Sequence, residues 1–120
     1  MRVLRVLVLL AVPWLALAQP PLYPELQADA KVIYVDFWAS WCGPCRRSFP
    51  WLNHMQAKYG EKGFTVIGVN VDPSREDAQL FLDKYPATFP LVYDPDGELA
   101  TRYALQGMPS SILLGADGEE

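Results

Sequence analysis

Residues 31–45 read KVIYVDFWASWCGPC, and this stretch decides the fold. Its first part, residues 31–38, is rich in β-branched and aromatic side chains, so it predicts a strand buried on both faces, as in the centre of a parallel sheet. Residues 39–43 predict a turn, and Pro44 suits the first turn of a following helix. The cysteines Cys42 and Cys45 therefore lie where a buried strand passes through a turn into a helix.

The sequence after the cysteines predicts a long helix. Its apolar residues at helical spacing are Phe49, Leu52, Met55 and Tyr59. Pro50 lies inside this pattern and predicts a kink, and the glycines at positions 60 and 63 predict the end of the helix.

The remaining sequence alternates predicted strands and helices. Strands are predicted over residues 64–71, 91–93 and 110–114, helices over 25–30, 74–85 and 98–105, and turns at 94–97 and 116–118. Alternation at this spacing is typical of an α/β fold with three layers.

The N-terminus has the pattern of an export signal. Arg2 and Arg5 give a positive start, an apolar run covers residues 6–17, and small residues follow, so we expect cleavage after Ala18. Residues 1–18 are then a signal peptide, residues 19–30 a lead-in segment and residues 31–120 the folded domain. The alternative is a membrane anchor, but the run is shorter than the roughly 20 residues of a spanning helix, and Pro13 interrupts it.

The charge of the chain excludes some classes of partner. The formal net charge is −4, and loss of residues 1–18 with their two arginines would bring it to about −6. An acidic domain without basic clusters argues against binding to nucleic acid or to an anionic membrane surface.

The cysteines form one Cys-x-x-Cys motif, so they cannot link distant parts of the chain. In an oxidising compartment this spacing is more typical of a reversible redox pair than of a framework disulfide. At the start of a helix, unpaired backbone amides and the helix dipole favour the thiolate of Cys42, which is the form that attacks disulfides. Cys45, one turn later, is placed to attack the resulting mixed disulfide.

A metal site is the alternative interpretation of the motif. Structural zinc would need two further ligands at compatible spacing, and the sequence contains one histidine, His54, and no third cysteine. A role in copper delivery that uses the two thiolates and His54 stays open.

Residues 37–45, FWASWCGPC, resemble the active-site segment of the thioredoxin superfamily. The segments RRSFPWL at 46–52, GVNVD at 68–72 and GMP at 107–109 resemble its exported TlpA/ResA-like branch. The resemblance runs from about residue 31 to residue 118 and implies a thioredoxin-like, three-layer α/β fold with a mixed central sheet. That fold has one more strand and a C-terminal helix after this point, so we expect the domain at 31–120 to be truncated at its C-terminus.

The resemblance also implies residue roles. Pro109 matches a cis-proline that faces the cysteines, and Met108 before it matches the backbone position that pairs with a bound substrate strand. Trp41 would form an apolar lip beside the reactive cysteine. Gly43 and Pro44, between the two cysteines, complete the expected substrate-binding surface.

Asp36 is an acid within a strand predicted to be buried, which is costly if the group is charged and unpaired. One interpretation is a partly exposed residue at the end of the strand. The resemblance implies instead a buried carboxyl group behind the cysteines, with a raised pKa, that accepts the proton of Cys45. Two departures from the family bear on this role: Ser48 stands where many ResA-like proteins have Glu, and Gly68 stands where thioredoxins usually have Lys.

Together these features predict a periplasmic thiol–disulfide oxidoreductase that reduces protein disulfides. The resemblance implies substrates such as those of the maturation of cytochrome c or of an oxidase. The redox-active disulfide of Cys42 and Cys45 would serve without a further cofactor or metal. The expected partners are disulfide-bearing proteins and a membrane thiol-delivery protein that keeps a monomeric enzyme reduced. A thiol oxidase or isomerase on the same fold, and a copper metallochaperone, are the alternatives.

Overall fold

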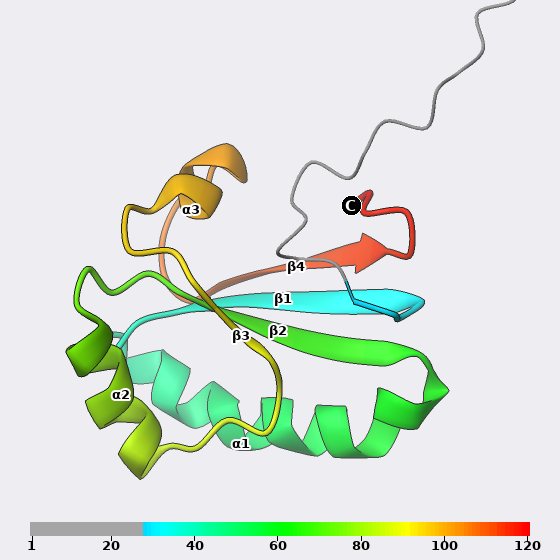
Figure 1. Cartoon of the computed structure of the whole chain (residues 1–120), viewed down its shortest axis with the longest axis horizontal. Coiled ribbons are helices and arrows are strands. Elements are labelled where there is room, and N and C mark those ends of the chain that lie inside the picture. The colour runs from blue at the N-terminus through cyan, green and yellow to red at the C-terminus, as the bar shows by residue number, and fades with distance from the viewer. Residues whose placement is uncertain (1–27) are drawn as a thin grey trace, which may run out of the picture.

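The computed structural model describes residues 28–120, and its sheet has the strand order β3-β2-β1-β4 (Figure 1). In chain order the elements are β1 (Val32–Trp38), α1 (Gly43–Tyr59), the 3-10 helix η2 (Gly60–Lys62), β2 (Phe64–Asn70), α2 (Arg75–Lys84), β3 (Leu91–Tyr93), α3 (Glu98–Arg102) and β4 (Ser110–Gly115). Strands β1, β2 and β3 are parallel, and β4 runs antiparallel to β1. The expected mixed sheet is therefore confirmed.

The sheet lies between two layers of helix. Figure 1 shows α1 and α2 against one face and α3 against the other. The side of α1 is filled by the α1-side core, which consists of Trp38, Ala39, Cys42, Cys45, Phe49, Leu52, Val66, Ala78, Phe81 and Phe89. The opposite side is filled by the α3-side core, which consists of Ile33, Val35, Phe37, Ile67, Val69, Leu99 and Leu114.

Strand β1 separates the two cores, because successive side chains of a strand point to opposite faces. Phe37 packs against Tyr103 on the α3 side, with ring centroids 6.2 Å apart. Trp38 packs against Phe49 of α1 with centroids 5.0 Å apart, so Asp36, two residues before it, shares the α1 face. The prediction of a strand buried on both faces is thus confirmed.

An aromatic cluster attaches α1 and α2 to the sheet. Phe49 lies 5.0 Å from Phe81 of α2 and 5.4 Å from Phe89, measured between ring centroids, in addition to its contact with Trp38. Burial of one such ring is worth about 1.5–3 kcal/mol, and each edge-to-face pair adds about 0.5–1.5 kcal/mol. This packing places the first turn of α1 at the end of β1.

Most predicted elements appear close to their expected limits. The helix predicted over 74–85 is α2, and the Ser74 hydroxyl caps it by accepting a hydrogen bond from the Asp77 amide at 3.4 Å. Pro50 lies inside α1, as predicted. Within residues 28–120, no helix has the length and apolar character needed to span a bilayer.

The helix predicted over 98–105 is shorter than expected, because α3 ends at Arg102. Ala104 has a φ of 51°, in the left-handed region, and the chain leaves the helix there. The short helix predicted over 25–30 is not seen at residues 28–30, and its earlier part lies outside the described residues. The predicted signal peptide also lies outside them.

Candidate active site

The two cysteines form a disulfide at the start of α1, with their Cα atoms 5.4 Å apart. Cys42 is the N-cap residue with an extended backbone, and Gly43 and Pro44 form the first positions of the helix. The Cys42 amide donates to the Ala39 carbonyl at 3.1 Å, and the Cys45 amide donates to the Cys42 carbonyl at 3.2 Å. A disulfide in this position can be reduced to two thiols and reformed within one turn of helix.

The two sulfur-bearing residues differ in their surroundings. Cys42 keeps 3% of its surface exposed, whereas Cys45 is 0% exposed within the α1-side core. Trp41, directly before Cys42, is 65% exposed. Access to the disulfide is therefore from the side of Cys42 and Trp41.

The loop before β4 approaches the same end of the sheet. The Met108–Pro109 peptide bond is cis, as the family resemblance implies. Met108 packs against the α1-side core, which contains both cysteines, and Pro109 is exposed. Because β4 is antiparallel to β1, with Ser110 opposite Phe37, this loop lies beside the end of β1 that leads to Cys42.

Asp36 is buried, with 4% of its surface exposed, so the interpretation as a partly exposed strand-end residue is wrong. Its neighbours in the sheet are Gly68 of β2 and Ser111 of β4. Among residues 28–120, neither its Oδ2 atom nor the indole nitrogen of Trp38 on the same face has a hydrogen-bond partner. Burial raises the pKa of the Asp36 carboxyl group from 3.8 to about 7, because the charged form is poorly solvated there.

The structure gives a packing reason for glycine at position 68. A Cβ atom at Gly68 would lie 2.8 Å from Phe89 Cε2, 3.0 Å from Leu91 Cδ2 and 3.1 Å from Trp38 Nε1. The space beside Asp36 that a larger residue would need is thus filled by aromatic and aliphatic side chains. Ser48, the other departure, donates its hydroxyl to the Cys45 carbonyl at 3.0 Å.

Asp72 is a buried polar residue whose role is not evident from the sequence pattern. Its carboxylate accepts hydrogen bonds from the Ser40 amide at 2.8 Å, the Ser40 hydroxyl at 2.7 Å and the Asn70 side-chain amide at 2.7 Å. Asp72 is 3% exposed and follows β2, so it ties the end of this strand to the loop that carries Trp41 and Cys42. Its position could have been noticed in the sequence, because an acid two residues after a parallel strand lies near the end of the neighbouring strand.

His54 is the remaining candidate residue. His54 is exposed on α1, nine residues along the chain from Cys45. Within residues 28–120, no three His, Cys, Asp or Glu side chains come together in a way that could hold a metal ion.

Comparisons with known proteins agree with this geometry. The model of the Redoxin family matches residues 23–120. The thiol-disulfide oxidoreductase ResA of Oceanobacillus iheyensis is 33% identical over 91 residues, which are 76% of this chain and 47% of ResA. ResA of Bacillus cereus is 33% identical over 89 residues, so the chain spans about half the length of these curated relatives.

Solved structures show the same similarity. A protein described as a thiol:disulfide interchange protein DsbE from Chlorobium tepidum is 52% identical with a TM-score of 0.73, and the match covers 76% of this chain and 64% of that one. StoA from Bacillus subtilis is 27% identical with a TM-score of 0.67 and coverages of 77% and 71%. With a thioredoxin-like sheet, a Cys-x-x-Cys disulfide at the start of α1 and a family match over most of its length, the chain belongs to the redoxin family and is similar to ResA and DsbE proteins.

Proposed function

We propose that this protein is a periplasmic thiol–disulfide oxidoreductase that reduces disulfides in other proteins. The observation that carries the proposal is the Cys42–Cys45 disulfide at the start of α1, next in the chain to the exposed Trp41. The similarity to proteins named ResA and DsbE supports the same chemistry. By this analogy the substrates would be proteins of cytochrome c or oxidase maturation.

The reaction begins with the dithiol form. The Cys42 thiolate attacks one sulfur of the substrate disulfide, so that a bond forms between Cys42 and that sulfur and the other substrate sulfur leaves as a thiolate. The Cys45 thiolate then attacks the Cys42 sulfur, which releases the second substrate thiol and restores the Cys42–Cys45 disulfide. Two electrons pass to the substrate, and the position of Cys42 at the N-cap of α1 supports its thiolate through the unpaired backbone amides.

Asp36 is the proposed proton acceptor for Cys45. A carboxyl group with a pKa of about 7 is partly ionised at neutral pH, so it can take up a proton from a thiol and release it again. Asp36 lies on the α1 face of β1, beneath the helix that carries the buried Cys45. Ser48 carries no carboxyl group, so Asp36 acts alone in this proposal.

The substrate chain is proposed to bind across the exposed edge of the site. Trp41 provides an apolar contact, Gly43 and Pro44 flank the disulfide, and Met108 with Pro109 presents backbone to the substrate on the other side. A membrane thiol-delivery protein would then return the oxidised monomer to its dithiol form. Nucleic acid is not among the proposed partners, because the chain is acidic.

The test is to trap the substrate with the Cys45→Ser variant in the cells that export the protein. This variant cannot resolve the mixed disulfide, so substrate should remain linked to Cys42 and be identified by mass spectrometry after acid quenching. The Cys42→Ser variant is the matched control and should retain no partner. A folded Cys45→Ser variant, as judged by circular dichroism, that recovers no Cys42-linked protein would contradict the proposal.

A redox titration of the purified protein against glutathione tests the direction of transfer. A reductase is expected to have a potential near that of thioredoxin, about −270 mV, whereas the strong oxidant DsbA lies near about −120 mV. A measured value close to the second figure would assign the protein to disulfide formation instead.

A further inference from the structure

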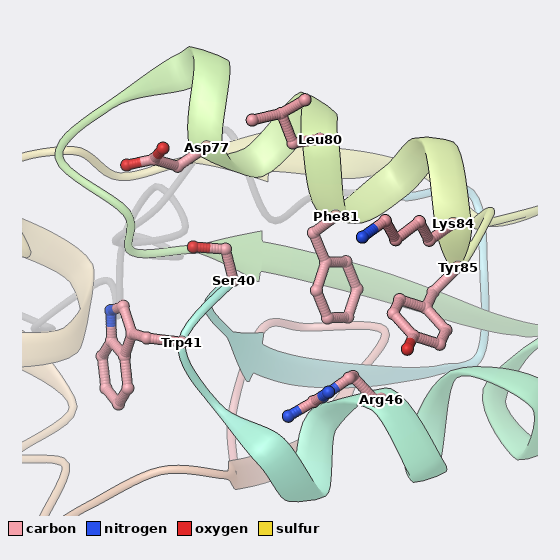
Figure 2. A pocket seen from close by; sticks show the side chains of 8 residues that line it. All are labelled: Ser40, Trp41, Arg46, Asp77, Leu80, Phe81, Lys84 and Tyr85. Atoms are coloured by element: carbon pink, nitrogen blue, oxygen red, sulfur yellow. The ribbon is translucent and has the colours of Figure 1, made fainter.

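A groove beside the disulfide, between α1 and α2, has a composition that the proposed reaction does not explain. Its volume is about 370 Å³, and its lining includes Trp41, Arg46, Asp77, Leu80, Lys84 and Tyr85 (Figure 2). We call it the α1–α2 groove. A second hollow of about 430 Å³, which includes Gly43 and Arg47, adjoins it and shares Arg46 and Tyr85.

The groove concentrates positive charge on an acidic protein. Figure 2 shows the charged ends of Arg46 and Lys84, from different helices, both pointing toward the end of the groove where Trp41 lies. Arg47 lies in the adjoining hollow, and Asp77 is the one carboxylate that lines either space. Among residues 28–120, no carboxylate lies within ion-pair distance of any of these three cations.

The groove also exposes apolar surface. Trp41 is 65% exposed and Leu80 is 59% exposed, although both are large apolar residues. Cations beside exposed aromatic and aliphatic surface complement a peptide that carries both carboxylates and apolar side chains. Trp41 precedes Cys42 and Gly43 follows it, so a chain in the groove would lie directly beside the attacking sulfur.

We propose that the α1–α2 groove binds an acidic, apolar segment of the substrate protein, next to the cysteine that Cys42 attacks. This inference rests on the proposed function, because it names the substrate class of the same site. Carboxylates on the substrate approach Arg46 and Lys84, and its apolar side chains cover Trp41 and Leu80. The groove thus selects among protein disulfides by the charge of the flanking sequence.

The test compares two synthetic peptides that differ only in the charge of the residues around their cysteine. Each carries a cysteine in mixed disulfide with mercaptoethanol, flanked by Glu-Leu pairs in one peptide and by Gln-Leu pairs in the other. The dithiol form of the full chain reacts with each peptide in a single turnover, and tryptophan fluorescence follows the rate. The quantity of interest is the ratio of the second-order rate constant for the Glu peptide to that for the Gln peptide.

We expect the Glu peptide to react about fivefold faster at low salt, as two exposed charge pairs would allow. The ratio should fall toward one in about 1 M salt, where the Debye length is about 3 Å. The double variant Arg46→Gln, Lys84→Gln should lose most of the preference. The control Lys58→Gln makes the same kind of change on α1, about 18 Å away along the helix, and should keep it.

A ratio that is the same in the wild type and in the double variant would overturn the proposal. A neutral substrate, hydroxyethyl disulfide, separates this failure from failure of the proposed function. If the dithiol protein reacts with it but shows no preference between the peptides, only the groove proposal fails. If it reacts with neither peptide nor hydroxyethyl disulfide, the proposed function itself fails.

Discussion

Replacement of Asp36 by Asn is expected to stabilise the oxidised protein at neutral pH and to change its stability little at acid pH. In the unfolded chain this carboxyl group ionises with an ordinary pKa of 3.8, whereas in the folded protein burial raises the pKa to about 7. Between these values the unfolded state has lost the proton and the folded state still holds it. Rising pH therefore favours unfolding of the wild type over this range.

The size of the effect follows from the pKa values. Each step of one pH unit between 3.8 and about 7 lowers the free energy of unfolding by up to about 1.4 kcal/mol, so the full loss is about 4 kcal/mol. Above pH 7 both states are ionised and the loss is constant. The Asn side chain does not titrate, so the Asp36→Asn variant should be free of this loss.

The assay is urea unfolding of the full chain, with the disulfide intact, at several pH values from 4 to 8.5. The difference in free energy of unfolding between variant and wild type should grow by about 3–4 kcal/mol across this range, because all other groups titrate alike in both proteins. An offset that does not depend on pH would reflect only the exchange of an acid for an amide. A difference that stays flat from pH 4 to 8.5 would refute the reasoning.

Three further predictions concern stability. Gly68→Ala should lower the free energy of unfolding by about 1–3 kcal/mol, because its Cβ would crowd packed side chains. Gly107→Ala should be nearly neutral in the same urea titration, because a Cβ there would have no atom within 4 Å. Asp72→Ala should lower the free energy of unfolding by about 2–4 kcal/mol, because it leaves the buried donors of Ser40 and Asn70 unpaired. Ser40→Ala should lower it by less, and equal losses of the two variants in thermal unfolding would contradict the role of Asp72 as the shared acceptor. Phe49→Ala should cost about 3–5 kcal/mol by calorimetry, and a loss below about 1 kcal/mol would mean that the aromatic cluster is not packed as described.

The central part of the fold could be predicted because its signals are local. The continuous apolar run of β1, the Ser74 cap and the proline after Gly43 each act within a few residues, and they locate β1, α2 and the start of α1. The end of α3 could not be found in this way. Ala104 takes a left-handed conformation that alanine rarely adopts, and no glycine or asparagine marks the place.

The site was predictable where the chemistry resides in one segment, as it does at Cys42 and Cys45. The contact between Ser40 and Asp72 was not, because these residues are far apart in the sequence and meet only through the parallel pairing of β1 and β2. The α1–α2 groove depends in the same way on how two helices pack on one sheet face. Arg46 and Lys84 are far apart in the sequence, and nothing in either local pattern relates one to the other.

The close packing around Gly68 has a consequence for how this family can change its sequence. A basic residue at position 68 could pair with Asp36, yet its side chain would collide with Phe89 and Leu91. Whether Asp36 has a basic partner at position 68 therefore depends on the size of the side chains at positions 89 and 91. A lysine at 68 would need more space at Phe89 and Leu91, so we expect position 68 to covary with positions 89 and 91 among related sequences.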